Sequence, residues 1–472
     1  MEGSPIVPPG LTVTARRLVE RVFPPGALIL SLLTFGYFAA GIVRNRVFAN
    51  TYGAGAELDA YNAAFRIPEI ALDVLVAAGL TAPFVPVFTS LRRKSEDSAN
   101  EFGRTVLTGA VLLMSVAIGL IFLAAPWLAT VVGAGFDDAT RELYVQLTRI
   151  NCIAQILFAA SICIGEVLVA NRRFLFYALA PILYTTGIIL GTVLGGEQFG
   201  VIATAWGAVA GAIAHLTIRV IGTLRTSFRI RPSFHFRSTG FREFFRLMLP
   251  RMLSHPIEPL TFTYFTILAS TLAVGSVSAV NFAADYQVVP VSLVGVSFSL
   301  AVFPVLSAAY ADGDRAAFTA VLRRNLVTIG GLTILAAIAL FLFSGVLVRV
   351  LLGGGKFDSE DVATTTAVVA AFALSVPFDS LAYPLSRGLY ATHDTIRQVG
   401  ASFAGFGTVL LVSTLIVPAV GILAIPLGYA AGMAVKVALL AVFLAPRVRR
   451  IGVSPANPPQ RPEPVPAASA PP

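Results

Sequence analysis

Residues 58–90 read LDAYNAAFRIPEIALDVLVAAGLTAPFVPVFTS, an apolar run that is long enough to cross a membrane. The run also carries polar and charged side chains at spacings of 3, 4, 3 and 4, namely Asp59, Asn62, Arg66, Glu69 and Asp73. This spacing places all five on one face of a helix, over roughly 21 Å of its length. Because a charge that faces lipid costs at least about 2.5–3.5 kcal/mol, we expect this stripe to face a protein interior or a wet cavity. The alternative is a structural lock in which Arg66 pairs with Glu69 or Asp73.

The composition of the whole chain agrees with a membrane protein. Of 472 residues, 56% are hydrophobic and 12% are charged, whereas about 25% of the residues of soluble proteins are charged. Apolar runs of spanning length lie at 27–49, 58–90, 104–132, 141–170, 174–195, 199–224, 242–272, 276–310, 319–350, 361–391, 395–418 and 420–446. They predict an all-α polytopic membrane protein with about twelve transmembrane helices. They exclude a soluble enzyme, a single-span receptor and a β-barrel, whose strands alternate in hydropathy.

Basic residues gather in alternate loops of this predicted topology. The loops that carry them include Arg92, Arg93, Lys94, Arg172, Arg173, Arg225, Arg229, Arg231, Arg237, Arg315, Arg323, Arg324, Arg447, Arg449 and Arg450. The other loops carry few, with Arg141, Arg349 and Lys356 as the exceptions. Such alternation marks the cytoplasmic side, so both termini are predicted to be cytoplasmic. It also accounts for the net charge of +9 without a nucleic-acid partner.

An internal repeat divides the chain. FVPVFTS (84–90) resembles VFPVLSA (302–308), and GAGFDD (133–138) resembles GGGKFD (353–358). The interval from Pro86 to Pro304 is nearly the same as that from Asn62 to Asn281 and that from Gly133 to Gly353. The alternative is chance similarity between apolar segments. The repeat predicts two six-helix lobes around a central cavity, the arrangement of a transporter. The predicted parts are a cytoplasmic N-terminal segment (1–26), an N-lobe (27–224), a basic linker (225–246), a C-lobe (247–446) and a disordered Pro/Ala-rich tail (447–472).

Other candidate residues extend the stripe into a cavity. Arg44 lies deep in the first predicted helix, and Arg251, His255 and Glu258 share one face of the seventh. In the eighth helix, Asn281 and Asp285 are the repeat counterparts of Asn62 and Arg66. The first, second, seventh and eighth helices are therefore expected to line one central polar cavity.

The sequence contains no recognisable enzyme motif. The segment LLGGGKFD (351–358) is no phosphate-binding loop, because Lys356 is followed by Phe357 instead of Ser or Thr. The four His residues are scattered, so neither a metal site nor a cofactor is expected. Transport driven by a gradient fits better than transport driven by ATP.

Several collinear segments resemble the MurJ/MviN lipid II flippases of the MATE-like exporter superfamily. They are GIVRNRVFANTYGAGAELDAYNAAFRIPE (41–69), AAGLTAPFVPVF (77–88), ANRRFLFYALAPIL (170–183), 268–307, GGGKFDSEDV (353–362) and GLYATHDT (388–395). The resemblance implies two lobes around a cationic cavity in the bacterial cytoplasmic membrane. It also implies translocation of an undecaprenyl-diphosphate-linked peptidoglycan precursor. Arg44, Asp59 and Arg66 match charged family positions.

This chain departs from the family pattern at several positions where the family has a charged residue. Phe38, Leu72 and Ala78 replace charged residues, whereas Asp73 and Asp285 stand where the family has arginine. The resemblance therefore leaves three hypotheses.

The first hypothesis is a lipid II flippase working by alternating access, with Arg44, Arg66 and Arg251 on the diphosphate and the lobes rocking about 225–246. The second is an exporter of another polyprenyl-linked glycan or a cation antiporter, because the predicted cavity is also rich in carboxylates. The third is a transport-incompetent scaffold that recruits cell-wall synthesis proteins. The expected partners are thus a polyprenyl-diphosphate lipid, membrane lipids and, for the scaffold, cell-wall enzymes.

Overall fold

The computed structural model describes residues 27–254 and 257–452. The predictions for segments 1–26 and 453–472, and for His255, lie outside these residues. The described residues form helices joined mostly by short turns, with one longer non-helical segment before α9 and a single isolated bridge between Gly354 and Phe357. The predicted all-α class is confirmed.

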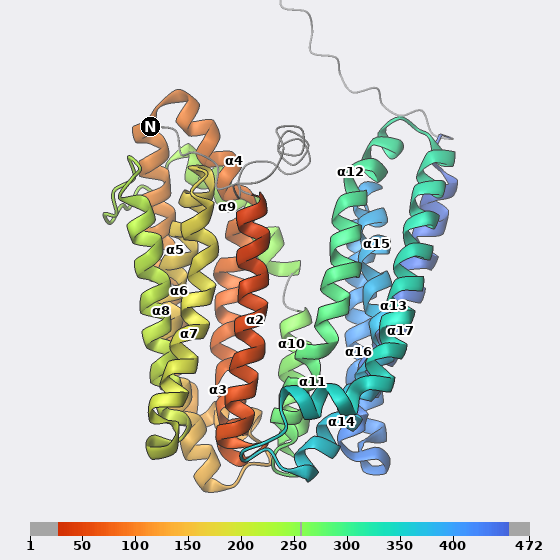
Figure 1. Ribbon diagram of the computed structural model, residues 1–472. Coiled ribbons are helices and arrows are strands. Elements are labelled where there is room, and N and C mark those ends of the chain that lie inside the picture. Colours follow the sequence, from red (N-terminus) through yellow and green to blue (C-terminus); the bar gives the residue numbers. More distant parts are fainter. Residues whose placement is uncertain (1–26, 255–256, 453–472) are drawn as a thin grey trace, which may run out of the picture. The chain divides into compact units, whose positions relative to one another are not determined.

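The helices follow the predicted apolar runs closely. In the first half of the chain they are α2 (Ala27–Tyr52), α3 (Ala56–Leu72), η1 (Asp73–Ala77), α4 (Ala78–Lys94), α5 (Glu96–Val132), α6 (Asp138–Ala170), α7 (Phe174–Phe199) and α8 (Val201–Thr223). In the second half they are α9 (Thr239–Ser254), α10 (Ile257–Ser270), α11 (Ser276–Pro290), η2 (Val291–Val296), α12 (Ser297–Ala311), α13 (Arg315–Leu351), α14 (Ser359–Ala373), α15 (Val376–Ala391), α16 (Thr395–Val420), η3 (Gly421–Leu423) and α17 (Ala424–Arg449). Figure 1 traces them in chain order. Each predicted run corresponds to one helix or to consecutive helices.

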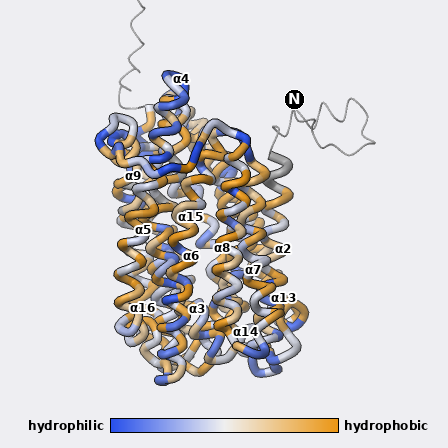
Figure 2. Tube along the Cα trace, turned by 90° about the vertical axis from the view of Figure 1, so that its left-hand side faces the viewer, coloured by the Kyte–Doolittle hydropathy of each residue, from blue (hydrophilic) through white to orange (hydrophobic). Residues whose placement is uncertain are grey.

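The number of membrane crossings is less definite than the helix pattern. Among the described residues, eight helical stretches are long and apolar enough to cross a membrane. The last of these, Thr395–Arg449, contains both α16 and α17. Figure 2 shows that hydrophilic residues gather at helix ends, whereas the middle parts are mostly hydrophobic. The predicted count of twelve is therefore approximate.

Packing divides the described chain into two compact units. Unit 1 contains the residues up to Phe282 together with Gly345–Thr366, and unit 2 contains Ala283–Ser344 and the residues from Ala367 onward. Helices α9 and α10 and the first part of α11 therefore belong to unit 1. The predicted lobe boundaries do not coincide with these units and stay a prediction.

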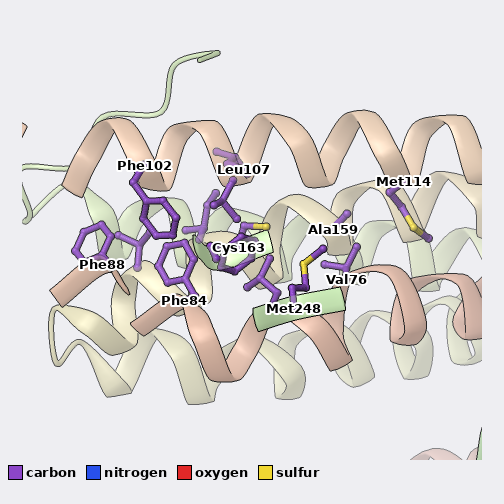
Figure 3. Close-up of a cluster of buried hydrophobic side chains, with 14 of the residues drawn as sticks. Val76, Phe84, Phe88, Phe102, Leu107, Met114, Ala159, Cys163 and Met248 are labelled. Atoms are coloured by element: carbon purple, nitrogen blue, oxygen red, sulfur yellow. The ribbon is translucent and has the colours of Figure 1, made fainter. Parts of the chain in front are cut away.

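The core of unit 1 is built where α4, α5, α6 and α9 meet. Phe84 and Phe88 of α4 pack against Phe102 of α5 and Phe244 of α9, with ring centroids 5.3–6.5 Å apart. Figure 3 shows this cluster, with Met248 of α9 next to the side chains of α4. This packing ties α9 firmly to the helices that precede it in the chain.

Segment 225–238, which we call the strap, is packed along α5. Phe228 is buried against Gly103, where an added Cβ would lie 2.9 Å from its ring. The hydroxyls of Thr105 and Ser233 are 2.9 Å apart, and Asn100 donates to Ser227 Oγ over 3.2 Å. The strap is thus an ordered part of unit 1. The role of 225–246 as a linker between lobes stays a prediction.

Helices α7 and α8 cross at glycines. A Cβ added at Gly207 would lie 2.6 Å from the carbonyl oxygen of Gly187, and one added at Gly191 would lie 2.6 Å from the Cα of Gly207. Gly211 similarly faces the backbone of Tyr184. The two backbones approach closely because neither helix has a side chain at the crossing, as in small-residue packing of membrane helices.

The bounds of the helices support the internal repeat. Helices α5 and α13 each have 37 residues, and they begin at Glu96 and Arg315. The two π-helices, η1 and η2, begin at Asp73 and Val291, which are separated by the same interval as Pro86 and Pro304. Helices α7 and α16 each have 26 residues. Matches in length as well as in sequence make chance similarity a poor explanation.

Unit 2 has its own apolar core and a polar tie at the start of α16. Leu306, Phe318, Leu385 and Leu440 are buried together in the core. Asp394, which precedes α16, accepts hydrogen bonds from Arg397 and from Arg447 near the end of α17. Burial disfavours the ionised form of Asp394, but these hydrogen bonds and the two positive charges outweigh it and lower its pKa.

Candidate functional site

The polar stripe lies on α3 and on the first residue of η1. Helix α3 continues through η1 into α4, so the run from Ala56 to Lys94 is helical throughout. The π-helical turn η1 begins at Asp73, and Pro68 leaves one backbone position of α3 without a donor. The stripe has an N-terminal part, which contacts α11, and a C-terminal part, which lines a cavity.

Asp59, in the N-terminal part of the stripe, caps another helix. Its carboxylate accepts hydrogen bonds from the backbone N–H of Gly275 at 2.7 Å, and from the N–H and hydroxyl of Ser278 at 2.8 and 2.6 Å. These donors lie at the beginning of α11, where the backbone N–H groups have no partner within the helix. Asn62 donates to the same Ser278 hydroxyl over 3.4 Å. Asp59 is buried. The partial positive charge at the start of α11 compensates the negative charge of its carboxylate.

Arg66 joins α3 to α10 and α11. Its Nε donates to Thr266 Oγ1 over 3.2 Å, and a second guanidinium nitrogen donates to Asn281 Oδ1. The guanidinium also lies over the ring of Phe262, 5.8 Å from its centroid. The guanidinium is thus oriented by neighbours on two other helices, an arrangement that fixes its position before any ligand arrives.

A cavity of about 360 Å³ lies next to Arg66, within unit 1. It is lined by Arg66, Glu69, Ile70, Asp73, Glu258, Pro259 and Phe262. The lining combines apolar walls with one guanidinium and three carboxylates. Such a mixture of apolar surface and a few convergent charged groups is typical of a ligand site.

The structure brings together some of the predicted residues and leaves others apart. Arg66, Glu69, Asp73 and Glu258 line the cavity, whereas Asp59 and Asn62 bind the start of α11. Their assignment as substrate-binding residues stays a prediction.

Four further candidates lie elsewhere or are not described. Arg44 of α2 donates to Asn45 Oδ1 at 2.8 and 3.1 Å and is not among the lining residues. Asp285 is exposed and belongs to unit 2. The side chains of Arg251 and His255 lie outside the described part of the structure.

Sequence reasoning missed the residues that hold Arg66 and wall the cavity. Thr266 was not singled out, and Phe262 follows Glu258 at the spacing of one helical turn, so this spacing already places Phe262 on the same face. It also missed how segment 345–366 joins unit 1. There Arg46 donates to Gly353 O over 2.5 Å, and Asp361 accepts from Ala54 N over 3.0 Å.

The cavity offers charge and apolar surface but no metal ligands in a suitable group. Among the described residues, no three His, Cys, Asp or Glu side chains lie close enough together to hold a metal ion. What the geometry supports is non-covalent binding of a molecule that carries both apolar and charged parts.

Comparison with known proteins assigns the chain to a family. Residues 48–456 match the family model described as the lipid II flippase MurJ. The chain belongs to the lipid II flippase MurJ family. A relative is the lipid II flippase MurJ of Burkholderia cenocepacia, which is 26% identical over 441 residues, or 90% of this chain and 84% of the relative. Membership of this family, together with the apolar stretches, makes the chain a multi-pass membrane protein of a transporter family.

Solved structures agree on the fold. The chain matches a lipid II flippase MurJ in an inward closed conformation with a TM-score of 0.76 and 22% identity, over 90% of each chain. It also matches an inward-facing multidrug resistance MATE family transporter of the MOP superfamily with a TM-score of 0.72 and 12% identity, over 87% of this chain and 94% of the other. The MurJ fold is therefore shared with the MATE transporters, as predicted.

Proposed function

We propose that this protein moves lipid II, an undecaprenyl-diphosphate-linked peptidoglycan precursor, across the bacterial cytoplasmic membrane by alternating access. The observation that carries the proposal is the match of residues 48–456 to the lipid II flippase family in a chain that also has a charged cavity among apolar helices. Translocation needs no covalent catalysis, because the lipid is moved unchanged.

Arg66 is the residue best placed to hold the diphosphate. Its guanidinium reaches the cavity and is oriented by Thr266 and Asn281, so a phosphate meets a fixed positive charge with donors in a planar array. A low-dielectric setting strengthens that attraction. Arg44 and Arg251 remain further candidates for the same role.

The charges along the chain favour one orientation in the membrane. The helical run from Ala56 to Lys94 begins next to the contacts of Asp59 with α11 and ends at Arg92, Arg93 and Lys94. Basic residues mark the cytoplasmic side, so we place the Lys94 end and both termini in the cytoplasm and the Asp59 contacts at the outer side. In the transport cycle, these outer contacts are the ones that release when the site opens outward.

Complementation tests the proposal. A strain depleted of its own lipid II flippase is expected to grow when it expresses this chain, and to stop growing with Arg66→Ala at the same membrane level. Lys94→Ala, at an exposed position in the last turn of α4, serves as the matched control and is expected to complement. Failure of the well-expressed wild type would rule out lipid II as cargo. Growth with both Arg44→Ala and Arg66→Ala would favour a scaffold that recruits cell-wall synthesis proteins.

A second candidate function is export of a cationic compound by antiport. It is favoured by the charge of the cavity, where three carboxylates, from Glu69, Asp73 and Glu258, face one guanidinium. Competition between an organic cation and a diphosphate lipid for the purified protein decides between the two. Tighter binding of the cation, lost in Glu69→Gln, would support antiport, whereas preference for the diphosphate supports the flippase.

A further inference from the structure

Helix α6 carries a row of polar side chains that are buried inside unit 1. Tyr144, Thr148, Asn151 and Gln155 follow one another at spacings of 4, 3 and 4, so they share one face of the helix. None of the four is more than 1% exposed. We call them the α6 row. Polar groups in the interior of a helical bundle need hydrogen-bond partners, so the partners of the α6 row have to be accounted for.

The described residues satisfy only part of the hydrogen-bonding capacity of the α6 row. Gln155 Nε2 donates to Asn151 Oδ1 over 3.1 Å, and Asn151 Nδ2 and Gln155 Oε1 have no partner among the described residues. Turning both amides over would again leave one oxygen and one nitrogen without a partner. The hydroxyls of Tyr144 and Thr148 are also unpartnered within the described part of the chain. A hydrogen bond between these two hydroxyls would still leave one O–H group without an acceptor.

The helices around α6 do not supply the missing partners. On one side of the α6 row, Cys152 Sγ donates to Ile118 O of α5 over 3.9 Å, and on the other side Ala154 packs against α8. The α6 row lies between these two directions, on the side where α3 packs against α6. A methyl group offers no hydrogen bond, and the fully buried residues of α3 include Ala60, Ala63 and Ala64.

The second repeat shows that the fold does not require a polar row at this place. The span Ser359–Ala391 has 33 residues, as α6 has, and the same interval separates the first and the last residues of the two. Although this span is interrupted between α14 and α15, the residues at three of the four row positions are buried and apolar. Thr365 stands at the position of Tyr144, and the other three positions hold Val369, Phe372 and Val376. Because an unpartnered polar group in the interior is costly, the α6 row points to a ligand that satisfies it.

We propose that the α6 row is a binding site for ordered water inside unit 1. The α6 row offers both donors and acceptors, and water is the small ligand that donates and accepts at the same time. A cation satisfies acceptors only, so it would leave the free amide N–H group of the Asn151–Gln155 pair without a partner. An anion would likewise leave the free amide oxygen without a donor. Bound water exchanges its hydrogen bonds readily, so α6 stays polar toward α3 without a fixed link between the two helices. The water site is independent of the cargo that the protein moves.

Radiolytic labelling of the full-length protein in lipid vesicles tests the site. A short X-ray pulse converts bound water into hydroxyl radicals, which oxidise the side chains next to that water, and mass spectrometry then identifies the oxidised residues. Tyr144 is expected to be oxidised readily although it is fully buried. Phe372, an equally buried aromatic residue at the repeat position of Asn151, is the internal control and is expected to stay unlabelled.

A substitution adds a second readout. Thr148→Val introduces the residue that the second repeat has at this position, at nearly the same size. Water in the α6 row would lose a partner, so Thr148→Val is expected to lower the unfolding temperature and to abolish most of the labelling of Tyr144. Thr148→Ser keeps the hydroxyl and is expected to keep the labelling. The matched control is Thr333→Val, because the Thr333 hydroxyl is buried and already donates to Ile329 O in its own helix. It is expected to leave the labelling of Tyr144 unchanged.

Three outcomes overturn the proposal. The first is labelling of Tyr144 that is no faster than that of Phe372. The second is a higher unfolding temperature in Thr148→Val than in the wild type, which would mean that the change removed an unpartnered hydroxyl from a dry row. The third is stabilisation of the wild type by sodium in place of choline that is lost in Thr148→Val, which would make the α6 row a cation site. Labelling of the wild type needs no variant, so the test stays decisive if Thr148→Val does not fold. Failure of lipid transport appears separately, in complementation, and leaves the labelling unchanged.

Discussion

At the scale of the residue, the most informative side chain is Asp59, because its partners give it a role that its sequence position does not suggest. A carboxylate in an apolar span suggests a ligand site. In the structure, Asp59 instead satisfies backbone donors of Gly275 and Ser278 at the start of a helix from the second half of the sequence. A buried charge can thus have a structural role within a membrane-spanning helix.

This role gives a prediction for Asp59→Ala. The substitution leaves buried N–H groups without an acceptor, and each such group costs about 1–3 kcal/mol, so we expect a loss of about 3 kcal/mol or more. The measurement is thermal unfolding of the purified protein in detergent. The matched control is Asp358→Ala, since Asp358 caps its own helix from an exposed position, through Glu360 N and Asp361 N. That cap is worth about 1 kcal/mol. Equal losses in the two variants would contradict the capping role.

At the scale of the element, the crossing of α7 and α8 shows what glycine contributes in a span. The backbones touch because Gly187, Gly191, Gly207 and Gly211 leave no side chain between them. In a membrane, where lipid is as apolar as the helices, such close backbone contact supplies much of the attraction between helices.

Gly207→Ala is therefore expected to destabilise the protein by about 1–3 kcal/mol, because its new methyl group meets the carbonyl oxygen of Gly187 at 2.6 Å. Gly119→Ala is the control, since a Cβ at that position of α5 meets nothing within 4 Å. Alanine there should be neutral or stabilising by about 0.5–1 kcal/mol. Unfolding temperatures of the two variants measure the difference, and a similar fall in both would mean that the crossing is not close-packed.

The sequence allowed the helices to be predicted because hydropathy is a local property of each run. The breaks within them were harder to place: the π-helical turns η1 and η2 have no local signature, although Pro377 does explain the break before α15. The candidate site was predictable in part. Spacing placed Arg66, Glu69 and Asp73 on one face, but the partners Thr266 and Asn281 lie in the second half of the sequence and follow only from the tertiary fold.

At the scale of the whole molecule, the strap is packed as a structural component of unit 1. The strap lies against α5, and the helix after it belongs to the core of unit 1. The role of 225–246 as the segment about which the lobes rock stays a prediction. The hydroxyls of Thr105 and Ser233 lie 2.9 Å apart, so cysteine side chains at these two positions would be close neighbours.

The variant Thr105→Cys with Ser233→Cys tests whether the strap has to move. Oxidation is expected to form a disulfide and to leave complementation by the doubly substituted chain as strong as in its reduced form. The native thiols of Cys152 and Cys163 are free and buried, and the two single variants control for them. Growth that stops on oxidation of the double variant alone would support the prediction that this segment is the hinge.

The division into units has a mechanical consequence. The chain passes from one unit to the other between Phe282 and Ala283, between Ser344 and Gly345, and between Thr366 and Ala367. All three passages fall inside helices, namely α11, α13 and α14. A helix resists bending more than a flexible linker does. Any rearrangement that moves the units relative to each other therefore has to bend or unwind three helices at once.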